Sequence, residues 1–269
     1  MKIAIVQLSG GLGNQIFQYS FGKYLTDKGF KVYFDKHSGF RGISIINKLD
    51  EFNFKIAYSK KLISIILFLL YRMNFKSFYF LEKEAFNFDE LIKNRKNRIS
   101  LFIGCWQNLK YVESFKDHLK DIIFDNNQSL IDLSKRFVFD TNSVAIHVRR
   151  GDYINNTLHE IVDENYFRQS IDLIYKKLTN PIFYVFSDDI LWCKFFFKGS
   201  NFIFIDFTKS EIEDFYLIQQ CTHKIISNST FSWWPSYLSD SNTIVICPSK
   251  WINGDNSSNS LQLSNWIKI

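Results

Sequence analysis

Two adjacent arginines, a carboxylate and a phenol gather in one short segment, His147–Tyr153. The segment follows an apolar run, Ser143–Ile146, that is typical of a buried strand. Parallel sheets bind ligands at the carboxyl ends of their strands, and an arginine presents a rigid fork of donors that matches phosphate oxygens. The segment therefore predicts an anion clamp of Arg149 and Arg150. The alternative is that both arginines are surface cations and Asp152 is only their partner.

A second polar segment, Ser227–Trp234, follows another predicted strand and opens a helix. Hydroxyl groups and free backbone N–H groups at such a turn attract anions. Simple N-capping by Ser229 above buried tryptophans is the alternative, but it accounts for one hydroxyl and not for the whole polar cluster. We expect a ligand to bind at this turn.

A glycine turn, Gly10–Gln15, lies between the first strand and the first helix. Glycines there let the backbone approach a ligand, and Asn14 adds an amide suited to a sugar or a phosphate. The dinucleotide pattern G-x-G-x-x-G is not met, because Ile16 stands where the third glycine would be. An NAD-dependent oxidoreductase built on this turn remains an alternative, as does a tight turn without a ligand.

Acidic residues supply the remaining candidates. Ser187 and Asp188 end a strand of the same sheet as Arg149, where they could bind ribose hydroxyls, a base edge or a metal. Because no D-x-D pair stands at a strand end, we expect no essential metal and no cofactor, with Arg149 and the helix end at Ser229 carrying the phosphate charge. Asp214 either faces the binding crevice or serves the helix dipole. His159 and the adjacent Glu160 could accept a proton.

Strands and helices alternate along the chain in the order that positions these segments. The opening reads as strand Lys2–Leu8, helix Gln15–Lys28 and strand Lys31–Phe34, a βαβ unit. Residues 50–97 give no clear pattern. A strand, Ile99–Cys105, and a helix, Tyr111–Ile122, follow. From Val144 onward the alternation is regular. The predicted strands are Val144–Val148, Ile182–Phe186, Asn201–Ile205, Lys224–Ser227 and Thr243–Cys247, and the helices are Glu164–Lys177, Ile190–Phe197, Ser210–Cys221 and Ser229–Leu238.

This alternation predicts an α/β protein with two Rossmann-like domains that face a central crevice. The domain boundary falls in the polar stretch near residues 128–142, which gives an acceptor-side domain, 1–135, and a nucleotide-binding domain, 136–269. A capping box at Ser210 and Glu213, and Asp163 before the preceding helix, mark two helix starts.

Composition limits the partners. Hydrophobic residues make up 46% of the 269 residues, which excludes a disordered chain, and the net charge is +6. Such a charge suits an anionic ligand, an acidic membrane surface or nucleic acid, but no basic stripe with interleaved aromatics supports nucleic acid. The four cysteines form no C-x-x-C pair and are expected to be reduced core residues. No signal peptide is evident, so we expect a cytoplasmic protein.

The longest apolar run, Leu62–Leu70, is about half of the ~20 residues that span a bilayer. Two interpretations stay open. The run is either a buried helix or an interfacial helix flanked by Lys60, Lys61 and Arg72, which would hold the protein at the inner face of the plasma membrane.

Three segments together, Gly11–Gln15, His147–Tyr153 and Ser227–Trp234, resemble the bacterial α-1,2-fucosyltransferases. The resemblance covers the chain from Ile3 to about Trp251. It implies a GT-B fold, GDP-fucose as the donor, and inverting transfer without an essential metal. We expect a galactose-terminated oligosaccharide or a lipid-linked glycan as the acceptor, since the basic surface and the Leu62–Leu70 run suit a membrane-borne one.

The resemblance also implies roles for single residues. Arg149 would grip the β-phosphate of GDP, His147 would lie near the nucleotide, and Asp214 would contact the guanine. Asn14 would lie by the fucose and the acceptor. The diphosphate would be held by Ser229, Thr230, Phe231 and Ser232. Asp152 would organise the arginines or act in catalysis.

The segment Ile154–Val162 departs from the family pattern, with His159–Glu160 in place of a His-Gly pair. The proton of the attacking hydroxyl would go to Asp152, to His159 or to water. A fucosyltransferase of other linkage and a non-catalytic protein that binds nucleotide or glycan are the further alternatives.

Overall fold

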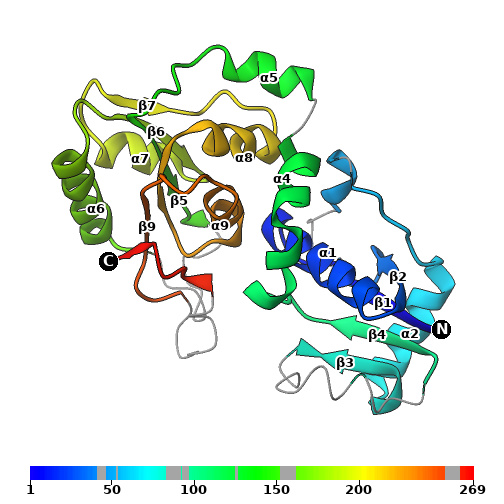
Figure 1. The fold of residues 1–269 in the computed structure, drawn as a ribbon. Helices are drawn as coiled ribbons and strands as arrows, with labels where there is room; N and C mark the ends of the chain where they lie inside the picture. Colours follow the sequence, from blue (N-terminus) through cyan, green and yellow to red (C-terminus); the bar gives the residue numbers. More distant parts are fainter. Residues whose placement is uncertain are drawn as a thin grey trace. The chain divides into compact units, whose positions relative to one another are not determined.

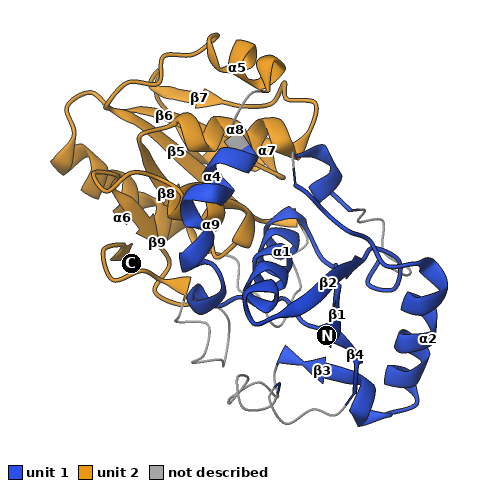
Figure 2. Cartoon of the chain, turned by 45° about the vertical axis from the view of Figure 1, so that its right-hand side comes forward, with its two compact units in different colours: residues 1–123 blue, residues 124–269 orange. Residues whose placement is uncertain are grey.

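The structure is a computed structural model that describes residues 1–40, 47–52, 54–82, 92, 97–124, 127–151, 162–251 and 261–269. The chain forms two compact units, Met1–Ile123 and Phe124–Ile269 (Figure 2). The division lies upstream of the expected boundary at 135/136. Helix α5 (Gln128–Ser134) joins the second unit because its Leu133 packs among Ala145, Leu217 and Ile218 in that unit's core.

The first unit has a four-stranded parallel sheet with the order β2-β1-β4-β3 (Figure 1). Its strands and helices are β1 (Lys2–Gln7), α1 (Leu12–Asp27), β2 (Phe30–Asp35), η1 (Leu49–Glu51), α2 (Lys61–Arg72), η2 (Lys76–Phe78), β3 (Tyr79–Leu81), β4 (Ile99–Ile103), η4 (Leu109–Tyr111), η5 (Glu113–Phe115) and α4 (Lys116–Phe124).

The two long helices of this unit lie on opposite faces of the sheet. Phe21 of α1 meets Phe102 of β4 edge-on, whereas Leu67 of α2 packs with Ile5 and Leu101. Side chains alternate between the two faces of a strand, so the neighbouring residues Leu101 and Phe102 of β4 contact α2 and α1, respectively. The sheet is therefore covered on both sides, as the βαβ opening predicts.

Several predicted boundaries shift for local reasons. Helix α1 begins before Gln15 because the extended backbone of Gly11 already forms its N-cap, and Gly29 follows its end with φ +83°. The expected helix Tyr111–Ile122 is wrong as one element: at Val112, where φ is −116°, it is interrupted between η4 and η5. The apolar run is helical, with Leu67 buried on one face and Leu62, Ile66 and Leu69 exposed on the other, so it is not a fully buried helix.

The second unit has a six-stranded parallel sheet with the order β10-β9-β8-β5-β6-β7 (Figure 1). Besides α5, its elements are β5 (Ser143–Val148), α6 (Glu164–Lys177), β6 (Ile182–Ser187), α7 (Ile190–Phe196), β7 (Phe202–Phe204), α8 (Glu211–Gln220), β8 (His223–Ile226), α9 (Thr230–Tyr237), β9 (Val245–Cys247) and β10 (Ile267–Lys268). All the predicted strands and helices of this unit are present, and α5 and β10 are additional.

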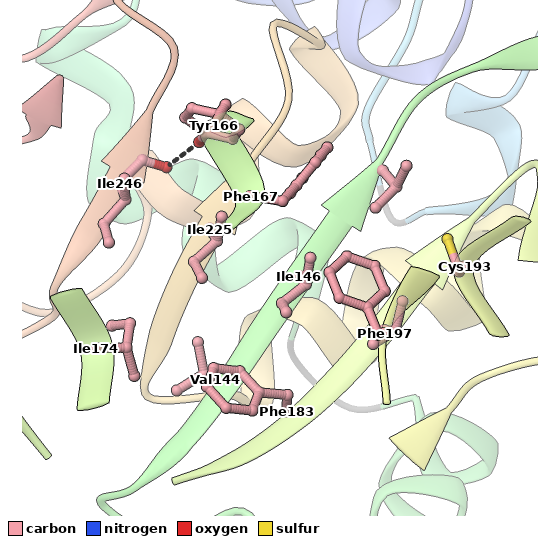
Figure 3. Packing of buried hydrophobic residues seen from close by; sticks show 12 residues of the cluster. Val144, Ile146, Tyr166, Phe167, Ile174, Phe183, Cys193, Phe197, Ile225 and Ile246 are labelled. Atoms are coloured by element: carbon pink, nitrogen blue, oxygen red, sulfur yellow. Dashed lines mark hydrogen bonds between the residues drawn. The ribbon is translucent and has the colours of Figure 1, made fainter. Parts of the chain in front are cut away.

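The core of the second unit lies on both faces of its sheet. On one face Val144 and Ile146 pack with Phe167 and Ile174 of α6, and the Tyr166 hydroxyl donates to the carbonyl of Ile246 at 3.0 Å (Figure 3). Ala145, between those two strand residues, faces helix α8 instead. His147 shares the parity of Ala145, so the pleat of β5 directs it to the α8 side.

Candidate active site at the edge of the second sheet

The direction of strand addition reverses between β5 and β8 in the second sheet, because the chain proceeds from β5 to β6 and β7 and then returns to the other side of β5. Open parallel sheets bind ligands at the carboxyl ends of the strands that flank such a reversal. Arg149 follows β5 there, and Ser227 follows β8.

The two loops at this reversal are joined by one buried hydroxyl. The Ser227 hydroxyl accepts from the backbone N–H of Arg149 at 3.1 Å and donates to the carbonyl of His147 at 2.7 Å. Ser227 is fully buried. This bridge fixes the start of the arginine segment against the start of the serine segment, so the structure brings the two predicted anion-binding segments together.

Asp188, at the end of β6, holds the arginine segment from the other side. Its carboxylate accepts from Arg149 Nη1 at 3.1 Å and from the backbone N–H groups of Arg150 at 2.9 Å and Gly151 at 3.1 Å. A Cβ on Gly151 would lie 2.9 Å from Asp188 Oδ2, so a larger residue there would displace the carboxylate. Asp188 therefore orients the segment that carries Arg149.

Arg150 turns toward helix α7. Its Nε donates to Asp189 Oδ2 at 3.1 Å, and its guanidinium lies over the Trp192 ring at 4.2 Å from the centroid. Asp189 also caps α7 by accepting from the Trp192 N–H. The Ser187 hydroxyl accepts from the Asp189 N–H at 2.9 Å. The adjacent arginines thus have different surroundings: Arg149 pairs with Asp188, and Arg150 with the base of α7.

Helix α9 begins directly after β8, and its first turn is held by its own hydroxyls. The Ser229 side chain accepts from the Phe231 N–H at 3.3 Å, and the Ser232 hydroxyl donates to the Ser229 carbonyl at 3.4 Å. Thr230 is only half-buried. Trp233 is fully buried and donates from Nε1 to the Leu261 carbonyl at 2.6 Å. The tryptophan thus anchors α9, while the positive end of its dipole stands beside the arginine segment.

Two buried titratable groups lie next to these elements. The His147 ring is 5.3 Å from the Phe231 ring, and its Nδ1 has no hydrogen-bond partner among the described residues. Burial, and secondarily the charge of Arg149, lowers the pKa of His147 to about 3, so the imidazole is neutral near pH 7.

Asp214 of helix α8 precedes Phe215, whose ring is 5.4 Å from that of Phe231. Burial raises the pKa of the Asp214 carboxyl to about 6, against the lowering effect of a hydrogen bond from Thr208. Its Oδ1 is buried and has no partner among the described residues. A buried acceptor oxygen without a hydrogen bond destabilises the folded protein, and a ligand that donates to it would remove this cost.

The first sheet has its own reversal, between β1 and β4, and amide side chains gather there. Asn14, at the start of α1, accepts at Oδ1 from Gln107 Nε2, which is 2.9 Å away. The backbone N–H of Gln107 donates to Glu82 at 3.0 Å. Sequence reasoning missed Gln107 and Glu82, although both follow strands of the sheet at its carboxyl edge, which is the signal that identified Arg149.

Other predicted residues are not placed. Asp152, His159 and Glu160 lie outside the described residues. Within the part of the chain that the structure describes, no group of three or more His, Cys, Asp or Glu side chains could hold a metal ion. The four cysteines are free thiols, and burial raises the pKa of Cys193 to about 11.

Comparison with known proteins shows the family. The profile of glycosyl transferase family 11 matches residues 3–269. The chain belongs to glycosyl transferase family 11. An alpha-1,2-colitosyltransferase of Escherichia coli is 33% identical over 93% of both chains. The O-antigen biosynthesis glycosyltransferase WbnK of Escherichia coli is 30% identical over 97% of this chain and 99% of its own.

A solved structure supports the fold of this family 11 member. The α-1,6-fucosyltransferase NodZ, soaked with GDP-fucose, superimposes with a TM-score of 0.52 at 13% identity, over 88% of this chain and 92% of its own. The expected α/β fold of GT-B type is confirmed, and so is the resemblance to the α-1,2-fucosyltransferases. The protein is a glycosyltransferase. Among its described residues, no helix is both long and apolar enough to cross a membrane.

Proposed function

We propose that this protein transfers L-fucose from GDP-fucose to the 2-hydroxyl of a terminal galactose on a surface glycan. The transfer inverts the anomeric centre and needs no essential metal. Family 11 membership and the name of the O-antigen relative support this class of reaction. The observation that carries the proposal is the hydrogen-bonded junction of Arg149, Ser227 and Asp188 at the reversal of a parallel sheet.

On the donor side, Arg149 and the N-terminus of α9 bind the diphosphate. In the reaction the galactose 2-hydroxyl oxygen forms a bond to the fucose anomeric carbon, and the bond from that carbon to the phosphate oxygen breaks. GDP leaves with the electron pair. A fixed guanidinium and a helix N-terminus, both already oriented, stabilise this charge without reorganising. Ser229, Thr230, Phe231 and Ser232 supply that N-terminus.

The base of the nucleotide is recognised by Asp214. Guanine presents N–H donors on its Watson–Crick edge, and the buried Asp214 Oδ1 is an acceptor that no donor of the described residues reaches. His147, neutral and packed on Phe231, forms part of the same surroundings. Asp188, Ser187 and Arg150 support the arginine segment, and the contacts of Arg150 with α7 favour this role over direct binding of nucleotide.

On the acceptor side, Asn14 contributes from the first unit, and its amide is oriented by Gln107. The proton of the attacking hydroxyl passes to Asp152 or His159. Acceptors are galactose-terminated oligosaccharides or lipid-linked glycans.

Transfer of colitose is the second candidate, and the 33% identity to the colitosyltransferase favours it. Colitose lacks the 3-hydroxyl of fucose. A site that hydrogen-bonds this hydroxyl rejects the deoxy sugar strongly, because its own polar groups would be left unpaired. A competition assay that offers GDP-fucose and GDP-colitose together, and measures which sugar is transferred, distinguishes the two candidates.

The test is an incubation of the protein with GDP-fucose and a panel of galactosides in the presence of EDTA, followed by determination of the product linkage. We expect an α-1,2-linked fucoside and release of GDP, both lost in Arg149→Ala. Binding of GDP-fucose without transfer to any acceptor would favour a non-catalytic binding protein. A different linkage, or activity that EDTA abolishes, would contradict the proposal as stated.

A further inference from the structure

Helix α2 carries a stripe of exposed apolar side chains on its outer face. Leu62, Ile66, Leu69 and Met73, which follows the helix, are 68%, 48%, 50% and 67% exposed. Their spacing of four, three and four residues places them along one line of an α-helix. We call Leu62, Ile66, Leu69 and Met73 the α2 stripe. Single exposed apolar residues are ordinary on proteins, but a continuous stripe marks a surface that binds something.

The opposite face of α2 packs on the first sheet, so the helix is firmly attached although the stripe is exposed. Leu67, 5% exposed, packs with Ile5, Tyr79 and Leu101, and Leu70 and Tyr71 lie against the same cluster. The helix therefore has one face that attaches it to the first sheet and another that the described part of this unit leaves uncovered. In Figure 2, α2 lies at the margin of the first unit, beyond β2 and β4.

The charge around the stripe indicates its partner. Between Phe52 and Leu81 the chain has no acidic residue, whereas its cations are Lys55, Lys60, Lys61, Arg72 and Lys76. All five cations are exposed. Two copies of this face would bring like charges together, which disfavours a homodimer through the stripe. A surface that is both apolar and negatively charged complements it.

We propose that the α2 stripe docks this protein on an anionic lipid bilayer. Helix α2 lies in the interface with Leu62, Ile66, Leu69 and Met73 in the acyl boundary, and the flanking lysines and arginine contact lipid phosphates. The twelve-residue helix is about 18 Å long, shorter than the ~30 Å hydrocarbon core, so it rests on the membrane and does not cross it. This inference goes beyond the proposed function and is tested without measuring sugar transfer.

The experiment is co-sedimentation of the full chain with phosphatidylcholine vesicles that contain or lack phosphatidylglycerol. We expect binding to the anionic vesicles that weakens with salt, and little binding to the neutral ones. Ile66→Gln with Leu69→Gln should weaken binding at least about tenfold. Lys60→Gln with Lys61→Gln should weaken it by roughly fivefold per cation removed.

Helix α7 provides the matched control, because Leu191 and Phe195 are 77% and 78% exposed one turn apart. Leu191→Gln with Phe195→Gln removes an equally exposed apolar pair and should leave vesicle binding unchanged. Circular dichroism checks that each variant is folded. A tryptophan at position 69, introduced as Leu69→Trp, should shift its emission to the blue with anionic vesicles.

Three outcomes would overturn the proposal. They are absence of wild-type binding to anionic vesicles, binding by the Ile66→Gln, Leu69→Gln variant equal to that of the wild type, and an equal loss in the α7 control. A dimer in sedimentation without lipid that the α2 variant dissociates would assign the stripe to a second copy instead. A failure of fucose transfer would leave these binding results unaffected, so the two proposals fail separately.

Discussion

The two sheets have the same strand arrangement at their carboxyl edges but carry different side chains there. Each has a reversal of strand order, with a strand, a short turn and a helix N-terminus beside it. At the second edge the turn carries Arg149, paired with Asp188, beside the hydroxyls of α9. At the first edge the start of α1 presents the amide of Asn14, and the segment after β4 presents that of Gln107. From this difference in side chains we propose that the two edges bind different ligands.

The guanidinium groups of the second edge suit a diphosphate, and the amides of Asn14 and Gln107, which lie beside the Glu82 carboxylate, suit sugar hydroxyls. The contacts that hold each edge in place also differ. The second edge is braced by ion pairs, Arg149 with Asp188 and Arg150 with Asp189. The first has the Glu82 carboxylate, which accepts from the Cys105 and Gln107 N–H groups, and amide contacts such as Gln18 Nε2 to the Gly104 carbonyl at 2.9 Å. Substitutions at the two edges should therefore affect different substrates.

The largest effect is expected at Arg149. Arg149→Ala should lower turnover with GDP-fucose by about a thousandfold, because departing GDP loses a fixed positive charge. The side chain is 34% exposed, so circular dichroism should show an unchanged melting temperature within a few degrees. Near-normal turnover in this variant would show that the charge of Arg149 does not stabilise departing GDP.

Asp214→Asn should weaken GDP binding by about tenfold to a hundredfold, because an amide cannot accept both donors of guanine as a carboxylate does. The same change should raise stability at pH 7 by about 1–2 kcal/mol, since it removes a poorly solvated charge. Calorimetric titration and thermal melts measure the two effects. Tighter GDP binding, or lower stability, would contradict this role.

The raised pKa of Asp214 also predicts a pH dependence. Burial raises the pKa of the folded carboxyl from its ordinary 3.8 to about 6. Between these values the folded state keeps a proton that the unfolded state loses, so this residue's contribution to stability falls as pH rises from about 4 to about 6. Wild-type GDP affinity should fall below about pH 6, and Asp214→Asn should flatten both curves.

Two neighbouring carboxylates sharpen the comparison within the second edge. Asp188→Asn should lower turnover by about tenfold or more, because it frees Arg149 and loosens the segment to Gly151. Asp189→Asn is the matched control. Asparagine keeps the cap of α7, so the change should cost no more than about 1 kcal/mol of stability, through the lost ion pair with Arg150, with little change in turnover. Equal losses of turnover would show that the two arginines act alike.

The smallest effect is expected at the first edge. Asn14→Ala should raise KM for the galactoside acceptor by about tenfold while the affinity for GDP stays unchanged, since one neutral hydrogen bond to sugar is lost. Gln107→Ala, which removes the partner of the Asn14 amide, should act in the same direction more weakly. A change in GDP affinity in either variant would mean that the first edge also binds nucleotide.

Much of this arrangement could be predicted from the sequence, and the exceptions have physical causes. The second unit was predictable because strand, cap and helix alternate there with strong local signals, such as Asp163 accepting from the Tyr166 N–H at 2.8 Å. The different partners of Arg149 and Arg150 could not be predicted. They are Asp188 for Arg149, and Asp189 and Trp192 for Arg150, and these residues meet the arginines only in the folded sheet.

The first unit was less predictable. Helix α2 has an apolar run that indicates a helix but does not say which face is covered, and its exposed stripe became clear only from the packing of Leu67 against the sheet. The position of Gln107 after a predicted strand could have marked it, but its contact with Asn14, far away in sequence, appears only in the folded unit.

The most direct test of the account is the preference of the protein for GDP over guanosine, measured by calorimetric titration in EDTA for the wild type, Arg149→Ala and Asp214→Asn. If fixed charge at the second edge binds the diphosphate, Arg149→Ala should reduce this preference at least about tenfold, whereas Asp214→Asn should weaken both ligands and leave the preference unchanged. An unchanged preference in Arg149→Ala, or a wild-type preference that disappears in EDTA, would contradict the account.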